Sequence, residues 1–527
     1  MLASGNAEDM FALIEKLLGQ MKAHNADLEL RLMKLLREKF GRASEKIDPA
    51  QLSLFLSVLA ASSEPGSAPE ETPAIPPPPK KDKEKPTTPG HGRKPLPSHL
   101  PRRPLIIPLS PEDCACETCG KSRRVFDHDC SELLDYEPGG FFVLEIKREK
   151  GVDDCACAPK PLFATAPTAD MVIPSGIPGP GLLAKVVTAK YADHLPLERQ
   201  SGMYAREGVE IAPSTLVDWI AAASILLLRI AGRIEAYALL AYVLWTDDTG
   251  LTVLDDKRAK GTKRGHMWVY VGDSRWAAFK YTPDWKADGP LAFLATRIGY
   301  LVADGYAGYR SLYQGPHPAK VVEVGCMMHC RRYFKAALDG KDLRAAVPIE
   351  YVRRLYEVER LADEREVDIE ERLRLRQELS RPVYEKLGAW IRALHGREPP
   401  KGKLGRALTY AVNHWTALGR FLEDARLPLD NGESERALRK VALGRLNYLF
   451  AGSDAGAERA AIIYTVIGTC LLNKVNPFEY LRDVFAKIAA GWPDSRLDEL
   501  LPPNWAAAQE QAQEQAAPAE PAGAFLN

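Results

Sequence analysis

The sequence predicts a multidomain α/β protein. The chain has 527 residues, enough for roughly three or four domains of ordinary size. From residue 239 onward, apolar and β-branched segments run into acidic ends, as in LLAYVLWTDD, LTVLDD, HMWVYVGD and GYLVAD, and KVVEVGC follows them. Helical segments lie between and after these expected strands, which is the pattern of an α/β sheet domain.

Composition excludes several classes of protein. With 46% hydrophobic residues the chain can bury ordinary cores, and 70 basic residues balance 70 acidic ones, which excludes a uniformly basic DNA coat. No apolar run reaches the roughly 18–20 residues of a membrane span; we expect Ala-rich turns and Arg229 to interrupt the longest one, near Ile220–Ile230. The start MLASGNAEDMF lacks a basic signal region, so we expect a cytoplasmic protein without membrane contact.

Residues 1–47 are predicted to form a coiled-coil helix. A heptad seam places Ile14, Met21, Leu28 and Leu35 at one core position and Phe11, Leu18, Asn25 and Leu32 at the other. A single polar seam residue such as Asn25 fixes register and strand number. We expect this helix to pair at least two copies of the chain; the alternative is an amphipathic helix packed on its own domain.

Residues 48–104 are predicted to be a Pro- and Lys-rich linker. The run PAIPPPPKKDKEKPTTPGHGRKPLPSHLPRRP is too rich in proline for helix or sheet. Between Lys80 and Arg103 it has eight basic and two acidic residues, so it can follow a DNA backbone or serve as a solvated spacer. Its candidate DNA-binding residues are Arg93, Lys94, Arg102 and Arg103.

Residues 105–165 contain six of the nine cysteines, between Cys114 and Cys157. Without a secretion signal, such a cluster favours metal binding over disulfides. The spacing Cys116-x-x-Cys119 is a good half-site for tetrahedral Zn²⁺. A turn at residues 138–140 is expected to precede a strand. The remaining cysteines are predicted to be buried small apolar residues: Cys326, Cys330 and Cys470.

The rest of the chain divides by its patterns. Residues 166–238 look helical, with Ser214 a candidate N-cap, and form either a DNA-binding helix-turn-helix or a plain helical module. Residues 239–470 hold the sheet, interrupted by a charged helical insertion at 340–404. A helical extension at 471–500 and a disordered tail at 501–527 complete the chain.

Three acidic residues of this sheet domain are candidate metal ligands. Asp247 and Asp304 end two expected strands, and Glu435 begins a helix after the insertion. Strand ends meet at one edge of a sheet, and converging carboxylates repel one another unless cations bind. Oxygen ligands suit Mg²⁺ or Mn²⁺, and two such ions can activate a nucleophile and stabilise a leaving oxygen at a phosphodiester.

Basic residues surround these acids. They fit a polyanionic substrate held at a metal centre, although surface ion pairing is the alternative. The candidate DNA-binding residues here are Arg331, Arg332, Arg436, Arg439, Lys440 and Arg445.

The sequence resembles the transposases of bacterial insertion sequence 66 over nearly its whole length. Matching segments include LLREKFGRASEKIDPAQLSLF, GRKPLPSHLPRRP and YADHLPLERQSGMYAREGVEIAPSTLVDW. Further on, WTDDTG, ADGYAGY, GCMMHCRRYF, DNGESERALRKVALGRLNYLFAGSDAGAERAA and NPFEYLRDVF follow in the family's order. Several long motifs in the right order make the resemblance specific.

The resemblance implies a ribonuclease-H-like catalytic domain with Asp247, Asp304 and Glu435 as an Asp-Asp-Glu triad that holds two Mg²⁺ or Mn²⁺ ions. Asp248 stands where the family usually has Glu, and Glu433 is a competing acid in the last motif. The resemblance also implies a structural Zn²⁺ on Cys116, Cys119, Cys155 and Cys157. Because the second pair is tighter than the family's, Cys114, His128 and Cys130 are possible substitutes.

The expected function is DNA transposition: binding of terminal inverted repeats, strand cleavage and strand transfer into target DNA. The resemblance implies a nucleoid-associated bacterial protein with accessory proteins of the same element. Two alternatives stay open, namely a nuclease that cuts without joining and a non-catalytic DNA-binding remnant of such an element.

Overall fold

The computed structural model describes residues 95–116, 119–153, 163–174, 176–314 and 320–516. The chain divides into two units, Met1–Gly92 and Arg93–Asn527, and all described residues belong to the second. The predicted coiled coil, most of the linker with Arg93 and Lys94, and the pair Cys155 and Cys157 lie outside the described residues.

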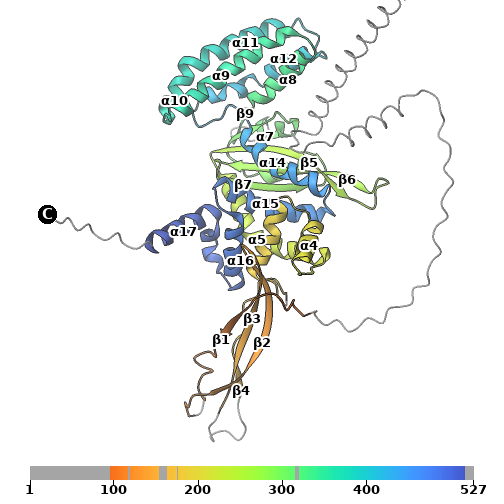
Figure 1. The fold of residues 1–527 in the computed structure, drawn as a ribbon. Coiled ribbons are helices and arrows are strands. Elements are labelled where there is room, and N and C mark those ends of the chain that lie inside the picture. The colour runs from red at the N-terminus through yellow and green to blue at the C-terminus, as the bar shows by residue number, and fades with distance from the viewer. Residues whose placement is uncertain (1–94, 117–118, 154–162, 175, 315–319, 517–527) are drawn as a thin grey trace, which may run out of the picture. The chain divides into compact units, whose positions relative to one another are not determined.

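A sheet of four strands occupies the region where we expected a zinc module. Its order is β1-β3-β2, and β4 also pairs with β3. The strands are β1 (Arg102–Ile107), β2 (Arg124–Glu137), β3 (Gly140–Val152) and β4 (Phe163–Thr165). The predicted turn joins β2 to β3, and Gly139 has φ of 114° there, a conformation that glycine adopts without strain. Figure 1 shows β2 and β3 as a long ribbon.

The predicted helical region 166–238 contains α3 (Pro180–Tyr191), α4 (Leu197–Arg206) and α5 (Pro213–Leu240). Helix α5 starts at Pro213 with Ala212 as its N-cap, not at Ser214, because proline suits the first helical turn. It runs for 28 residues without the expected interruption, since alanine and leucine are strong helix formers. The second helix of the expected helix-turn-helix is therefore a long core helix.

In the part of the chain that the structure describes, two helices are long and apolar enough to cross a membrane by length and composition, namely α5 and α15 (Asp454–Leu472). Inside the protein, 44% of the apolar window of α5 and 50% of that of α15 is buried. They pack against each other and against one strand of the second sheet. This packing accounts for their apolar composition as core helices.

The second sheet has five strands in the order β7-β6-β5-β8-β9. Strands β5, β6 and β7 pair antiparallel, whereas β8 and β9 continue parallel to β5. The strands are β5 (Val243–Leu254), β6 (Thr262–Gly272), β7 (Trp276–Thr282), β8 (Gly299–Ala303) and β9 (Val321–Gly325). The first two strands expected from the sequence are one strand, β5, and β7 was not expected. The domain is thus a mixed α/β structure.

Helices cover both faces of this sheet. On one face, Phe279 of β7 contacts Tyr464 of α15 with ring centroids 5.6 Å apart, and α14 (Gly432–Tyr448) packs on β5 and β6. On the other face, Tyr270 stacks on Phe293 of α6 (Asp288–Leu294) at 4.2 Å. The short helices η1 (Ala307–Tyr309) and α7 (Arg310–Gln314) follow β8.

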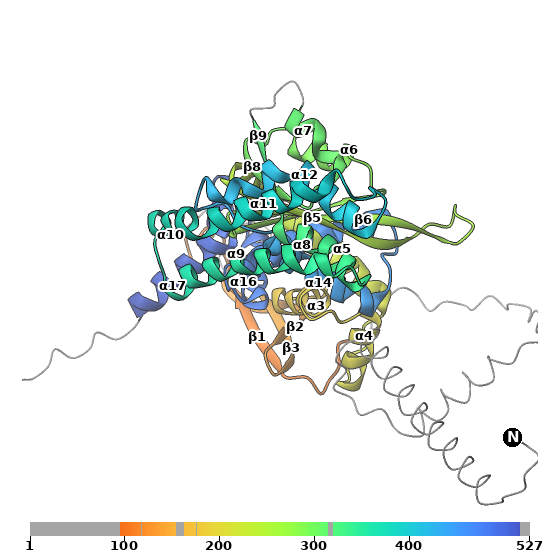
Figure 2. The ribbon, with the colours of Figure 1, turned by 90° about the horizontal axis from the view of Figure 1, so that it is seen from above.

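The insertion between β9 and α14 is a helical bundle with its own hydrophobic core, which includes Phe334, Leu355, Leu387 and Leu408. It begins directly after β9, earlier than the expected residue 340. Figures 1 and 2 show its main helices side by side. The elements are α8 (Met327–Asp339), η2 (Leu343–Ala345), α9 (Ala346–Glu364), α10 (Ile369–Leu375), η3 (Arg376–Ser380), α11 (Arg381–His395), α12 (Lys403–Asn413), α13 (Trp415–Gly419) and η4 (Arg420–Leu422).

The C-terminal region is helical further than expected. After α15 come α16 (Pro477–Ala489), η5 (Asp494–Leu500) and α17 (Pro502–Ala516). The expected disordered tail from residue 501 is therefore wrong for residues 502–516. Trp505 anchors α17, because its indole donates a hydrogen bond to Asp483 at 2.6 Å and its ring contacts Tyr480. Residues 517–527 lie outside the described part.

Candidate active site

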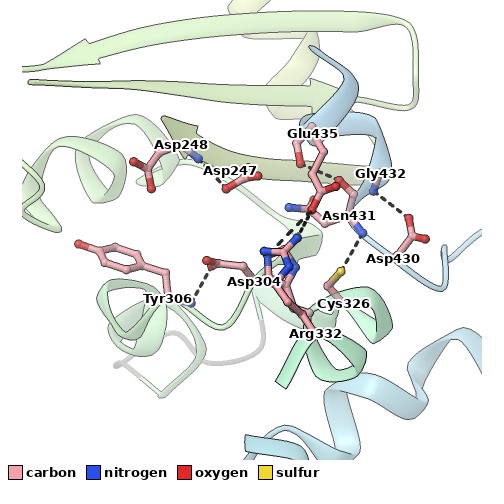
Figure 3. Close-up of polar contacts among 12 residues, drawn as sticks. Asp247, Asp248, Asp304, Tyr306, Cys326, Arg332, Asp430, Asn431, Gly432 and Glu435 are labelled. Carbon is pink, nitrogen blue, oxygen red and sulfur yellow. Dashed lines mark hydrogen bonds and ion pairs between the residues drawn. The ribbon is translucent and has the colours of Figure 1, made fainter. Parts of the chain in front are cut away.

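The ends of β5 and β8 bring two of the predicted acids together. In the parallel register Trp245 pairs with Val302, and continuing both strands by two residues places Asp247 beside Asp304. The third acid, Glu435, lies in the first turn of α14, which packs on β5. Figure 3 shows the three carboxylates around one space. We call Asp247, Asp304 and Glu435 the acidic triad.

Asp247 has the most perturbed environment of the triad. Burial raises the pKa of its carboxyl to about 7, and the charges of Asp304, Asp248 and Glu435 add to this rise. The backbone N–H of Asp248 donates to Asp247 Oδ1 at 2.8 Å and opposes the rise only in part. A half-buried carboxylate that faces other carboxylates favours a bound proton or a bound cation.

Asp248 lies on the opposite face of β5, as strand alternation requires. Its two carboxylate oxygens are held by aromatic side chains: His266 Nδ1 lies 2.5 Å from Oδ2, and the Trp285 indole donates to Oδ1 at 3.0 Å. Asp248 is therefore engaged away from the acidic triad. Of the two neighbouring acids, Asp247 is the one that faces Asp304 and Glu435.

Asn431 fixes the start of α14 against the sheet. Its side-chain amide donates to the Thr246 carbonyl at 2.9 Å, and its backbone N–H donates to Cys326 Sγ at 3.2 Å. These two bonds join α14 to β5 and to the start of the insertion, and so determine where Glu435 lies. Sequence reasoning missed Asn431, although an Asn directly before a helix is a recognisable N-cap signal.

Glu433 and Glu435 have different partners. Glu433 accepts a hydrogen bond from Arg436 at 2.5 Å, three residues along α14. Glu435 accepts a hydrogen bond from Arg332 of α8 at 3.2 Å, and its Oε1 lies 4.0 Å from His329 Nε2. Burial and the Arg332 charge lower the pKa of His329, so the imidazole is neutral near pH 7. Glu433 is thus an ion-paired neighbour, not a member of the triad.

Asp304 is held by the loop that follows β8. Its Oδ1 accepts from the Tyr306 N–H at 2.9 Å, and its carbonyl accepts from the Tyr410 hydroxyl of α12 at 2.8 Å. The second bond ties the end of β8 to the insertion. The insertion therefore supplies contacts to two triad members, through Tyr410 and Arg332.

The donor set of the triad suits Mg²⁺ or Mn²⁺, because all three side chains offer oxygen ligands. Burial and the neighbouring carboxylates raise the pKa of Asp247, and a bound cation would favour its charged form. As the side chains lie here, no three His, Cys, Asp or Glu residues of the described part form a closed metal cage. Glu435 is turned to Arg332 instead.

The other predicted cations differ in what they contact. Arg102 donates to Glu132 and to four backbone carbonyls, and Arg103 pairs with Glu137, so both brace the first sheet. Arg445 donates to Thr249 and to the Gly250 carbonyl. Lys440 reaches the Ala192 carbonyl at 3.4 Å. Arg439 is exposed and Arg331 half-buried beside Arg332.

The predicted zinc half-site lies in a tight turn. Cys116 donates its N–H to Lys121 and accepts from the Gly120 N–H, and Gly120 has φ of 69°. This turn brings the backbone of Cys116 and Cys119 to one end of a small hairpin. The suggested substitutes His128 and Cys130 lie within β2, and the described residues contain no group of three ligands that includes them. Zinc binding stays a prediction, because Cys155 and Cys157 lie outside the described residues.

Comparison with known proteins identifies the family. The model described as "Transposase IS66 family" matches residues 175–459, which include all three triad members. The model described as "IS66 C-terminal element" matches residues 465–502, and that described as "Transposase C of IS166 homeodomain" matches residues 27–104. The matches follow one another along the chain in the order that the sequence resemblance predicts.

Relatives of similar length occur in Sinorhizobium fredii. The uncharacterized protein y4hP is 34% identical over 510 residues, which cover 91% of this chain and 88% of the relative. The uncharacterized protein y4qI is 33% identical over 442 residues, covering 80% of this chain and 79% of the relative. With one family model matching more than half of its length, the chain belongs to the IS66 family of transposases.

Proposed function

We propose that the chain is a DNA transposase that cuts and joins DNA strands at the acidic triad. The observation that carries this proposal is the convergence of Asp247, Asp304 and Glu435 from three distant segments onto one space. Divalent cations, Mg²⁺ or Mn²⁺, bound there would activate a nucleophile and stabilise the leaving oxygen at a phosphodiester.

The reaction has two steps, and in each an oxygen nucleophile attacks the phosphorus of a phosphodiester. First, water attacks the phosphorus at an element end; the P–O3′ bond breaks, leaving a 3′-hydroxyl and a 5′-phosphate. Second, that 3′-hydroxyl attacks a phosphodiester of the target DNA, forming a new P–O bond and releasing a target 3′-hydroxyl. Asp247 and Asp304 would hold the cations, and Glu435 would complete the site once it leaves Arg332, which is then free to contact a phosphate.

The mixed sheet supports the expected ribonuclease-H-like fold of this domain. Three antiparallel strands followed by two parallel ones, with the acids at the ends of β5 and β8 and on a helix after the insertion, agree with that expectation. The further expectations, namely terminal-repeat binding, a dimer through residues 1–47, a structural zinc and accessory proteins, belong to this proposal.

A strand-transfer assay tests the proposal. Labelled DNA with the ends of the encoding element is incubated with the full chain, target DNA and Mg²⁺ or Mn²⁺. Glu435→Gln keeps the side-chain shape but removes the charge, and we expect both cleavage and joining to fall roughly a thousandfold. Glu433→Gln is the matched control, because it lies on the same turn and pairs with Arg436; its activity should stay close to wild type.

The assay also separates the alternatives. Cleavage without joined product would identify a nuclease, and binding without cleavage would identify a non-catalytic remnant. Equal activity of Glu435→Gln and wild type would overturn the triad.

A further inference from the structure

An exposed aromatic surface lies on the face of β5 opposite Asp247, next to the loop that holds Asp304. All nine tryptophans of the chain lie in the described part, and Trp285, in the loop after β7, is the exposed one, at 54%. Its ring stacks near that of His266, with centroids 5.9 Å apart and planes at 19°. Tyr306 packs against it at 5.1 Å. We call Trp285, His266 and Tyr306 the aromatic platform.

The platform is held rigidly although its outer ring faces water. The Trp285 indole donates to Asp248 at 3.0 Å, and its backbone carbonyl accepts from the Tyr306 hydroxyl at 2.9 Å. The second oxygen of Asp248 contacts His266. An exposed indole does not gain the free energy that burial of its apolar surface would give. Holding the Trp285 ring in one position also costs side-chain entropy. Such a surface is preformed for a planar ligand.

The platform is joined directly to the acids of the triad. Asp248 follows Asp247 in β5, and Tyr306 donates its N–H to Asp304. Asp248 and the Trp285 indole lie on the face of β5 opposite Asp247, so the platform is connected to the triad through Tyr306, which packs on Trp285 and donates its N–H to Asp304. Tyr306 and the exposed Arg310 also line a hollow of about 410 Å³ after β8. The surroundings thus combine a π surface with a cation, the two elements that hold single-stranded nucleic acid.

We propose that Trp285 stacks on an unpaired nucleobase of the DNA end that is processed at the acidic triad. This inference rests on the proposed function and adds how the end is positioned. A base pushed out of the duplex loses its neighbour stacking, and an aromatic ring replaces it with little dependence on base identity. Asp248 is then a positioning residue that keeps the indole in place, which gives a role to the second acid of β5.

Fluorescence of 2-aminopurine tests the proposal. The probe is a short duplex with a single-stranded overhang that carries 2-aminopurine and a dye on the far end, mixed with the full chain and Ca²⁺. Dye anisotropy reports binding, and 2-aminopurine emission falls when the base stacks. We expect strong quenching with wild type and with Trp285→Phe, and loss of quenching with Trp285→Ala together with about tenfold weaker binding.

Two further variants make the test specific. Asp248→Ala should reduce quenching in the same direction as Trp285→Ala, because it releases the indole. Trp492→Ala is the control: its indole also donates a hydrogen bond, here to the backbone carbonyl of Arg496, but it lies in the C-terminal region. It should quench like wild type.

The outcomes distinguish this inference from the proposed function. Binding with undiminished quenching by Trp285→Ala, or binding without quenching by wild type, overturns the platform and leaves the transposase proposal standing. No binding of the duplex by wild type overturns both.

Discussion

In two charge-rich regions of the molecule, the insertion and the acidic triad, the surroundings shift the pKa of a carboxylate in opposite directions. In the insertion, Arg353 and Arg354 donate hydrogen bonds to Glu350 and lower its pKa to about 2. In the acidic triad, burial and neighbouring carboxylates raise the pKa of Asp247 to about 7. Glu350 has these partners three and four residues away on the same helix. In the triad, Glu435 pairs with Arg332, whereas Asp247 has only the Asp248 backbone N–H to oppose the rise in its pKa.

The difference separates structural charge from functional charge. A carboxylate with a local arginine is stable without a ligand, so it reveals little about function. A partly buried carboxylate facing other carboxylates reduces stability, and such a cost is typical of a site that binds or reacts. The predictions below test this comparison in order of expected effect.

The largest change in the free energy of unfolding is expected at the ion pair between Arg376 and Glu359 of the insertion, in which Arg376 is buried. Arg376 donates from Nε and Nη2 to the two carboxylate oxygens of Glu359, each at 2.7 Å, and from Nη1 to the carbonyls of Phe421 and Leu427. Arg376→Met should destabilise the insertion by about 3–5 kcal/mol, because Glu359 keeps only Arg372 as a partner and the carbonyls of Phe421 and Leu427 lose their donor. Urea unfolding monitored by tryptophan fluorescence measures this change in the free energy of unfolding. The double variant Glu359→Gln, Arg376→Met should recover part of the loss. A change under about 1 kcal/mol would contradict it.

In metal-free protein, Asp247→Asn should raise the free energy of unfolding, which is the opposite of the effect expected for Arg376→Met. A folded-state pKa raised to about 7 means that charging Asp247 opposes folding; this penalty is absent near pH 4, grows as the pH rises to about 7, and is complete above it. The neutral variant should gain about 2 kcal/mol at pH 8 and less at pH 5. Thermal unfolding in EDTA at both pH values checks the sign; an equal or lower Tm at pH 8 would contradict the proposed environment of Asp247.

Mg²⁺ should remove the same penalty in wild type. At concentrations well above its dissociation constant, a ligand that binds only the folded state adds roughly 1–3 kcal/mol, so we expect Tm to rise by a few degrees with Mg²⁺ in wild type and not in Asp247→Asn. Differential scanning fluorimetry without DNA measures this independently of activity. Glu433→Gln serves as the control and should respond like wild type, and an equal rise in Asp247→Asn would place the ion elsewhere.

The smallest effect is expected at an exposed pair of the insertion. Arg374 donates to Glu371 and to Glu378 on its own helical face. Arg374→Ala should leave Tm unchanged within error, since exposed pairs in water contribute little. A loss comparable to that of Arg376→Met would show that the comparison between paired and unpaired charge is too simple.

The sequence predicted much of the architecture because its signals are local. Apolar segments with acidic ends located β5, β6 and β8, the apolar segment KVVEVGC located β9, and the Pro-Gly-Gly turn located the start of β3. The errors arose where local signals compete: α5 runs through the Ala-rich stretch and Arg229, where an interruption was expected, and β7 lacks a clear alternating pattern. The segment after residue 501 is polar, yet Trp505 anchors it as α17.

The sequence by itself determined which segments carry the acids, the cysteines and the family motifs, because residue identity and spacing survive without a fold. The tertiary structure alone decided which acid faces which. Asp247 and Asp248 are adjacent in sequence, but alternation along β5 sends one toward Asp304 and the other toward Trp285. Arg445 and Arg332 read alike in the sequence, yet one braces β5 and the other contacts Glu435. Side-chain partners come from distant segments, and only the packed chain brings those segments together.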